Sequence, residues 1–226
     1  MKIEVCCNSL YSVQIAEKLG ASRVELCQNL LQDGLTPSME LLREACESHS
    51  IPIHVLIRPR MGDFFYTSAD LNHIEKSIIK ALNFPIAGIV VGHMTNEKGV
   101  DLGLLRHWRA LTPGLELSFH RAFDRVKNPF NVLEQLVEAG FNRILSSGQQ
   151  ATASLGINLL QELQRIARST LEIMPGGGIN EKNISEFKKA GFTSIHLSAK
   201  SRSLPAHLEP TIDLNILEKV LSLSSK

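Results

Sequence analysis

The sequence has 226 residues and a mass of 25.0 kDa, and 43% of its residues are hydrophobic and 21% charged, as in an ordinary globular protein. Its 24 basic and 23 acidic residues give a net charge of +1. This excludes the strong positive field typical of proteins that bind nucleic acid or anionic membranes. Glu4 interrupts the first apolar run, and no window reaches about 18 uncharged apolar residues. We therefore expect a cytoplasmic protein without a signal peptide or a membrane span.

Short apolar runs alternate with longer segments of helical periodicity along the chain. The predicted strands are residues 3–7, 23–27, 53–58, 88–92, 116–120, 143–147, 172–174 and 194–198. The predicted helices are residues 10–19, 39–48, 71–82, 102–111, 130–139, 155–169, 181–190 and 214–223. This alternation favours a parallel sheet with helical crossovers, and roughly eight units of about 25–30 residues fit an α/β fold that closes into a single (β/α)8 TIM-type barrel.

The predicted barrel forms one domain over residues 1–226, because no linker or low-complexity tract divides the chain. An open doubly wound sheet is the alternative architecture. The barrel is favoured because the number of units matches and because no G-x-G-x-x-G motif follows the first predicted strand.

Side-chain alternation predicts which strand residues face the barrel interior. The outside of a barrel packs against helices, so the apolar Ile3, Val5 and Cys7 face outward, and Glu4 and Cys6 face inward. The same parity predicts a mostly polar inward set on the other strands: Arg23, Glu25, Cys27, His54, Leu56, Arg58, Glu116, Ser118, His120, His196 and Ser198. Because a buried charge is costly without a partner, we expect the inward glutamates to pair with inward arginines or with a protonated His120.

A run of glycines follows the seventh predicted strand. Gly176, Gly177 and Gly178 would let backbone N–H groups approach an anion, and barrels often bind phosphate with the loops after strands seven and eight. Ser147 after the sixth strand and Ser198 after the eighth could add hydrogen-bond donors. The alternative is a tight turn that needs glycine for its backbone conformation.

Ionisable residues at the carboxyl ends of the strands suggest a catalytic site. His120 could act as a general acid or base or as a metal ligand, and Asp124 could fix the tautomer of His120. Glu25 could serve as an electrostatic or metal-binding partner. Arg58 and Arg60, placed around a proline and followed by aromatic residues, predict a lid that clamps an anionic ligand.

The four cysteines are Cys6, Cys7, Cys27 and Cys46, and in a cytosolic chain we expect free thiols or metal ligands rather than disulfides. Cys6 and Cys27 fall on neighbouring predicted strands and both face inward. Two thiolates a few ångströms apart could bind Cu(I) in near-linear geometry. The alternative is that these cysteines fill the core as small apolar residues.

Several motifs occur together, in order, over nearly the whole chain. They are E-V-C-C at 4–7, R-V-E-L-C at 23–27, G-L-T-P-S at 34–38, I-R-P-R at 57–60, G-D-F at 62–64, F-H-R-A-F-D at 119–124, R-I-L-S-S-G at 143–148, I-M-P-G-G-G-I at 173–179 and I-H-L-S at 195–198. This combination resembles the copper homeostasis protein CutC family. The resemblance implies a TIM-type barrel, a cytoplasmic location, an oligomer that is most often a homodimer, and a copper-binding role in copper homeostasis.

The sequence departs from the family pattern at two places. Residues 88–99 differ from the Phe-Gly…Asp-Gly form expected there, and Gln149 stands where a second glycine commonly follows Ser-Gly. Neither departure changes the cysteines or His120.

Three functions remain open from the sequence. A copper homeostasis protein would bind Cu(I) through its inward cysteine pair. A barrel enzyme would act on a small anionic or phosphorylated metabolite with His120, Asp124, Glu25 and Arg58 and with the glycine-rich loop. An inactive barrel would serve only as an interaction surface.

Overall fold

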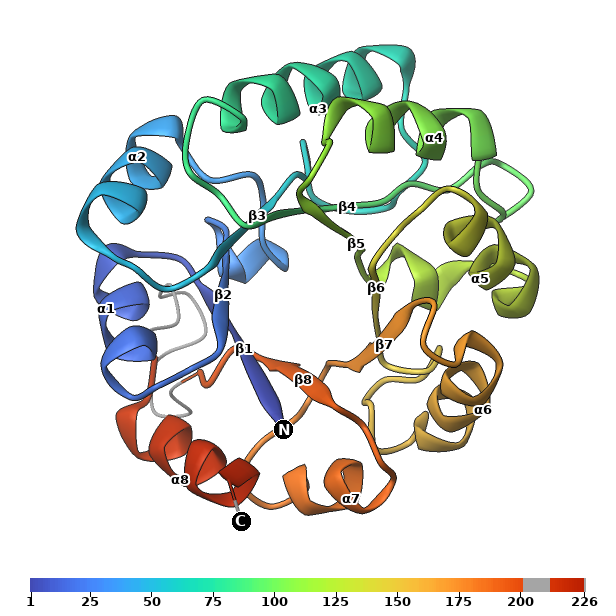
Figure 1. The fold of residues 1–226 in the computed structure, drawn as a ribbon. Helices are drawn as coiled ribbons and strands as arrows, with labels where there is room; N and C mark the ends of the chain where they lie inside the picture. The colour runs from blue at the N-terminus through green and yellow to red at the C-terminus, as the bar shows by residue number, and fades with distance from the viewer. Residues whose placement is uncertain (201–211, 226) are drawn as a thin grey trace.

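Eight parallel strands form the ring at the centre of the computed structural model, which describes residues 1–200 and 212–225 (Figure 1). The strands are β1 Lys2–Cys7, β2 Arg23–Leu26, β3 Ile53–Leu56, β4 Gly88–Val91, β5 Glu116–Phe119, β6 Arg143–Ser146, β7 Glu172–Pro175 and β8 Ser194–Leu197. Their order in the sheet is β7-β6-β5-β4-β3-β2-β1-β8. The predicted (β/α)8 barrel is confirmed.

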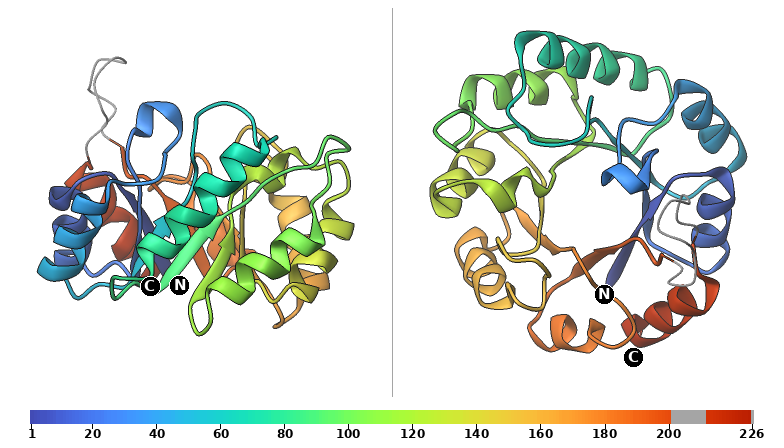
Figure 2. Two further views of the ribbon diagram at one scale, coloured as in Figure 1. Left: turned by 90° about the horizontal axis from the view of Figure 1, so that it is seen from above. Right: turned by 180° about the vertical axis from the view of Figure 1, so that it is seen from behind.

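A helix follows each strand and packs on the outside of the ring. The helices are α1 Leu10–Lys18, α2 Met39–Ser48, α3 Ser68–Ala81, α4 Leu102–Leu111, α5 Pro129–Glu138, α6 Ile157–Ala167, α7 Ile184–Lys189 and α8 Leu214–Ser225. Two 3-10 helices, η1 Leu30–Gln32 and η2 Arg121–Arg125, lie in the loops after β2 and β5. Figure 2 shows both chain termini at one end of the barrel and η1 at the opposite end, which is the end toward which the strands run.

Polar side chains begin several of these helices. Ser38, Thr67, Asp101 and Asn128 each accept a hydrogen bond from a backbone N–H group in the first turn of α2, α3, α4 and α5. This satisfies donors that have no partner within the helix. These caps therefore fix the residues at which the loops after β2, β3, β4 and β5 end and the helices begin.

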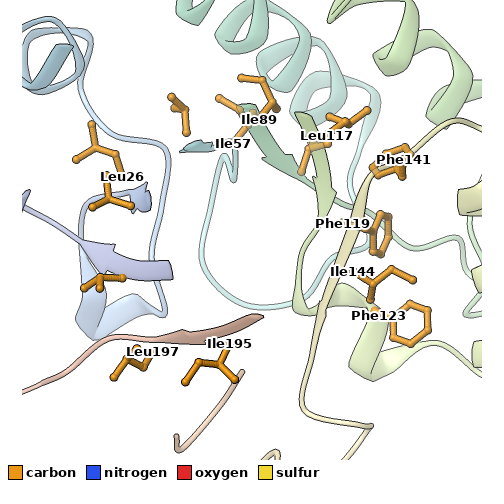
Figure 3. Close-up of a cluster of buried hydrophobic side chains, with 14 of the residues drawn as sticks. Leu26, Ile57, Ile89, Leu117, Phe119, Phe123, Phe141, Ile144, Ile195 and Leu197 are labelled. Atoms are coloured by element: carbon orange, nitrogen blue, oxygen red, sulfur yellow. The ribbon is translucent and has the colours of Figure 1, made fainter. Parts of the chain in front are cut away.

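The main hydrophobic core lies between the strands and the helices. Leu26, Ile89, Leu117 and Ile195 are fully buried there, and Figure 3 shows their side chains on the helix side of the ring. Ile3, Val5 and Cys7 belong to the same core, whereas Cys6 and Cys27 belong to a separate small cluster with Leu30, Leu56 and Val90. The predicted parity of the first two strands is confirmed.

The first strand pairs with both of its neighbours in a register that brings three charged residues to one level. Glu4 stands opposite Arg23 of β2 and opposite His196 of β8. The ring closes between β7 and β8 through an isolated bridge that joins Gly176 to His196. His196 therefore lies at the junction that closes the barrel.

Within the two described ranges, none of the helices has the length and apolar composition needed to cross a membrane.

Candidate functional site

A cavity of about 810 Å³ opens at the carboxyl ends of the strands, the face on which barrels of this type bind ligands. Of the residues predicted from the sequence, eight line it: Cys6, Glu25, Arg58, His120, Asp124, Gly177, Gly178 and Ser198. Cys27, Ser147 and Gly176 lie outside this lining. The lining also contains Lys98, Arg121, Arg125 and Lys200, so cationic side chains are well represented around the cavity.

Glu4 is the centre of a buried ion network in the barrel interior. Its carboxylate pairs with the Arg23 guanidinium, and one of its oxygens lies 2.8 Å from Nδ1 of His196. The other oxygen lies 3.7 Å from Nδ1 of His54. Burial alone would raise the pKa of Glu4, but the hydrogen bond with His196 and the charge of Arg23 hold that pKa well below its usual range. Glu4 is therefore ionised at neutral pH.

His196, rather than His120, is the histidine cation of the cavity floor. Burial opposes its protonation, but the carboxylates of Glu25 and Glu4 and the Cys6 thiol raise the pKa of His196 well above its ordinary value. Its Nε2 atom lies 3.8 Å from Oε2 of Glu25. The predicted pairing of an inward glutamate with an inward arginine is thus confirmed for Glu4 and Arg23, whereas the predicted protonated His120 is corrected to His196, which lies between both glutamates.

Glu25 keeps one carboxylate oxygen without a partner. Burial raises the pKa of Glu25 against the opposing charge of His196. Its Oε1 atom is buried and accepts no hydrogen bond from the described residues. Such an atom is unusual, because buried polar groups are normally hydrogen-bonded.

His120 carries no charge. Burial, together with the nearby charge of Arg58, lowers the pKa of His120 to about 3. Its Nδ1 atom accepts a hydrogen bond from the backbone N–H of Ala122 at 3.1 Å, which assigns the ring proton to Nε2. Nε2 is buried and has no hydrogen-bond partner among the described residues. The ring packs against Phe64, with 4.9 Å between the two ring centroids.

Asp124 binds the loop after β6 instead of His120. Its carboxylate accepts hydrogen bonds from Oγ of Ser146 at 2.6 Å, from the backbone N–H of Ser147 at 2.9 Å and from the backbone N–H of Gln149 at 3.2 Å. Arg121 pairs with it at 2.8 Å. The tautomer of His120 is therefore set by a backbone group, and the donors predicted at Ser147 for an external anion bind an anion of the protein itself.

Arg58 holds the loops after β2 and β3 together. Its Nη1 atom donates to the carbonyl oxygens of residues 32–34 at 2.9 to 3.2 Å, and Nη2 donates to that of Gly62 at 3.0 Å. Arg60 pairs with Asp63 at 2.9 Å. Most N–H groups of Arg58 and Arg60, the predicted anion clamp, therefore donate to other groups of the protein rather than to a ligand. Nε of Arg58 is buried and has no hydrogen-bond partner in the described ranges.

The glycine-rich loop has two parts with different surroundings. A Cβ atom at Gly176 would lie 2.4 Å from Cδ1 of Leu145, so close packing requires glycine there. Gly177 and Gly178 have φ angles of 105° and 76°, a region that favours glycine, and both line the cavity. The tight-turn alternative therefore accounts for Gly177 and Gly178, whereas close packing accounts for Gly176, and Gly177 and Gly178 can also contact a ligand in the cavity.

The Sγ atoms of Cys6 and Cys27 lie 3.5 Å apart. Cys6 is 8% exposed and faces the cavity, whereas Cys27 is fully buried. The hydrogen bond with Cys27 and burial raise the pKa of the Cys6 thiol well above its usual value. All four cysteines are free thiols.

Comparison with known proteins identifies the family. The sequence profile of the CutC family matches residues 1–201. The chain belongs to the CutC family. A CutC family protein of Pectobacterium atrosepticum is 43% identical over 200 residues, which cover 88% of this chain and 78% of that protein. One from Yersinia pseudotuberculosis is 41% identical over 206 residues, which cover 91% of this chain and 81% of that protein.

A solved structure carries the same fold and the same family name. It is a protein of Streptococcus agalactiae described as a candidate copper homeostasis protein CutC, with a TM-score of 0.81 and 32% sequence identity. The match covers 87% of this chain and 97% of that chain. The resemblance seen in the motifs is thereby confirmed.

His196 is a cavity residue to which the sequence interpretation assigned no catalytic or metal-binding role. In this CutC-family barrel the ligand atoms of Cys6, Glu25 and His196 all lie within 4.8 Å of one another. Parity had placed His196 inside the barrel, but its neighbours depend on how β8 pairs with β1. The sequence predicted only that the His196 side chain faces inward. The register of β1 against β2 and β8 decided that it lies beside Cys6 and Glu25.

Proposed function

We propose that this CutC-family protein acts in copper homeostasis by binding a Cu(I) ion between Cys6 and Cys27. The observation that supports this best is the 3.5 Å separation of the two Sγ atoms. Thiolates are soft ligands that select Cu(I). Family membership and the similarity to the S. agalactiae protein support the link to copper homeostasis.

The spacing of the sulfurs fits a bent site better than the near-linear one expected from the sequence. With metal–sulfur bonds of about 2.3 Å, as in zinc thiolates, two sulfurs in line with the ion would stand about 4.6 Å apart. The observed 3.5 Å separation corresponds to an angle of about 100° at the ion with bonds of that length. A bent pair leaves one side of the ion open to a further ligand.

The cavity is the route by which the ion would reach the thiols. Cys6 lines the cavity, whereas Cys27 is fully buried beside Leu56 and Leu30. Cu(I) would meet Cys6 first and then bind Cys27, and each thiol would release its proton to water as its sulfur becomes a thiolate ligand. The apolar side chains around Cys27 would protect the bound ion from water.

Competition with a chromophoric Cu(I) chelator, on reduced protein without oxygen, tests this function. Cys6→Ser and Cys27→Ser should each weaken Cu(I) binding by more than about tenfold, because loss of outer-shell partners alone costs roughly 10–100-fold. Cys46→Ser is the matched control, since Cys46 is a half-buried thiol on α2. Equal affinities of Cys27→Ser and the wild type would remove the thiol-pair proposal.

A second candidate is an enzyme that acts on a small anionic or phosphorylated metabolite. Three buried polar atoms in cavity-lining side chains have no partner among the described residues: Oε1 of Glu25, Nε of Arg58 and Nε2 of His120. Buried polar groups normally form hydrogen bonds, so a bound ligand would supply the missing partners. Glu25 would accept a proton from this ligand, and the neutral His120 would donate a hydrogen bond to its oxygen.

The anionic end of such a metabolite would lie near Gly177, Gly178 and Ser198, with Lys98 and Lys200 on the same lining. A thermal-shift screen of phosphorylated sugars and carboxylates tests the candidate, and a binder should raise the unfolding temperature of the wild type. His120→Asn should lose that shift. His107→Asn should keep it, because His107 lies exposed on α4. Absence of a shift with every compound would count heavily against an enzyme.

We also propose that the protein is a homodimer in the cytoplasm, as family membership implies. Its four free thiols suit a reducing compartment. Analytical ultracentrifugation and cell fractionation test the two statements separately. A monomer at micromolar concentration, or recovery outside the cytoplasm, would contradict the respective statement.

A further inference from the structure

Three different metal-ligating side chains meet at the floor of the cavity. Cys6 comes from β1, Glu25 from β2 and His196 from β8, and one ligand atom of each lies within 4.8 Å of the others. The strand pairing brings them together, because Cys6 stands opposite Glu25 and the neighbouring Glu4 stands opposite His196. Their placement therefore depends on strands rather than on loops, and it requires no ligand to assemble.

We propose that Cys6, Glu25 and His196 form a site for a divalent cation of borderline softness, such as Zn²⁺. Zinc takes thiolate, imidazole and carboxylate ligands, and this set provides one of each. Catalytic zinc sites commonly use three protein ligands and leave a fourth position open. All three residues line the cavity of about 810 Å³, so the open position would face its interior.

Glu4 orients the imidazole for this role. Its Oε1 atom lies 2.8 Å from Nδ1 of His196, so Glu4 can keep the Nδ1–H hydrogen bond while Nε2, which faces Glu25, would release its proton when the metal binds. A carboxylate behind a ligating histidine is a recurrent arrangement in metal sites, where it selects the tautomer and makes the ligand more basic. Arg23 holds Glu4 in place from the other side.

The unpartnered oxygen of Glu25 independently suggests a bound cation. Glu25 is 4% exposed, and its Oε1 atom has no hydrogen-bond partner within the described ranges. A metal ion bound between Cys6 and His196 would give this oxygen the partner that it lacks. Such an ion could then bind a water molecule or an anionic oxygen of a ligand in the cavity.

This site shares Cys6 with the proposed Cu(I) pair but does not depend on it, and single substitutions separate the two. Cys27→Ser removes a Cu(I) ligand and leaves the three divalent ligands intact. Glu25→Gln weakens the divalent set and leaves both thiols intact. Failure of one proposal is therefore distinguishable from failure of the other.

Titration of the reduced full-length protein with Co²⁺ tests the site, because a thiolate–cobalt bond absorbs in the near ultraviolet and a four-coordinate cobalt ion absorbs in the visible. We expect both bands in the wild type, in Cys27→Ser and in the control Cys46→Ser. The near-ultraviolet band should be lost in Cys6→Ser. Glu25→Gln and His196→Asn should bind Co²⁺ at least tenfold more weakly.

Absence of the thiolate band in the wild type would overturn the proposal. Loss of the bands in Cys27→Ser with retention in Glu25→Gln would also overturn it, because the ion would then lie between the two thiols. X-ray absorption of the zinc-loaded wild type decides the matter if a variant does not fold. One sulfur together with nitrogen and oxygen neighbours is expected, and two sulfurs would contradict the assignment.

Discussion

Nδ1 of His196 lies 2.8 Å from Oε1 of Glu4, although 192 positions separate the two residues in the sequence. The contact joins the last strand of the barrel to the first. Since Glu4 also pairs with Arg23 of β2, one carboxylate links three adjacent strands in the barrel interior. The integrity of the barrel and the geometry of the candidate metal site therefore depend on the same buried charges.

Glu4→Gln should strongly destabilise the fold. It removes the closer anionic partner of the buried Arg23 guanidinium and leaves only Glu172, whose Oε2 lies 4.0 Å from Nη2, and breaking a buried pair in this way costs about 3–5 kcal/mol. Urea unfolding followed by the fluorescence of Trp108, which is fully buried, measures the change. Glu138→Gln is the control, because the Glu138–Arg106 pair is more than half exposed and should contribute at most about 1 kcal/mol. Equal effects of the two substitutions would contradict the buried network.

Stability should fall in mild acid because of buried neutral histidines such as His93. Burial lowers the pKa of His93 to about 4, whereas an unfolded chain has a histidine pKa of about 6.5. The unfolded state therefore binds the proton more readily, so stability is full above about pH 6.5 and is lost as pH falls toward about 4. One such histidine should lower the free energy of unfolding by about 2 kcal/mol at pH 5 relative to pH 8.

Guanidinium unfolding at the two pH values checks this dependence. His93→Gln should lose less free energy of unfolding between pH 8 and pH 5 than the wild type. His107→Gln, a substitution of an exposed histidine, is the control and should lose as much as the wild type. A loss in His93→Gln as large as that of the wild type would show that His93 titrates normally in the folded protein.

Gly176→Ala should strain the junction that closes the barrel. The added Cβ would lie 2.4 Å from Cδ1 of the buried Leu145 and 3.2 Å from Cβ of His196, and overpacking of this kind typically costs about 1–3 kcal/mol. Thermal unfolding should therefore occur at a lower temperature. At Gly99 the nearest atom to an added Cβ lies at 3.7 Å, so Gly99→Ala should leave the midpoint nearly unchanged. An unchanged unfolding temperature in Gly176→Ala would contradict the predicted strain and would mean that the loop moves to accommodate the methyl group.

Asp124→Asn should loosen the loop after β6 without changing the tautomer of His120. Amide hydrogen exchange at Ser147 and Gln149 should accelerate, because both N–H groups donate to the Asp124 carboxylate. The ¹⁵N signals of His120 should stay those of a neutral ring with its proton on Nε2, since Nδ1 accepts from the Ala122 backbone. A change of the His120 tautomer in the variant would instead support the hypothesis from the sequence that Asp124 fixes this tautomer.

Local periodicity determined the architecture and the inward residues. Alternating strand and helix patterns predicted the (β/α)8 barrel, because each pattern depends on neighbouring residues alone. The two-residue period of a strand likewise placed Cys6, Cys27 and His120 inside. The predicted ends of β2 and β3, at 27 and 58, lie beyond the observed ends at Leu26 and Leu56, although Cys27 and Ile57 each still donate a backbone hydrogen bond to a neighbouring strand.

Tertiary structure decided which inward residues contact one another. The sequence offered several partners for Glu4 and Glu25, and only the register of β1 against β8 brings His196 to both. Asp124 turned to the loop after β6, because the N–H groups there lie within hydrogen-bond distance of its carboxylate. Inward or outward placement follows from the spacing of residues along one strand. Which inward residues contact one another depends on distances between strands that are far apart in the chain. The spacing of residues in the sequence does not determine these distances.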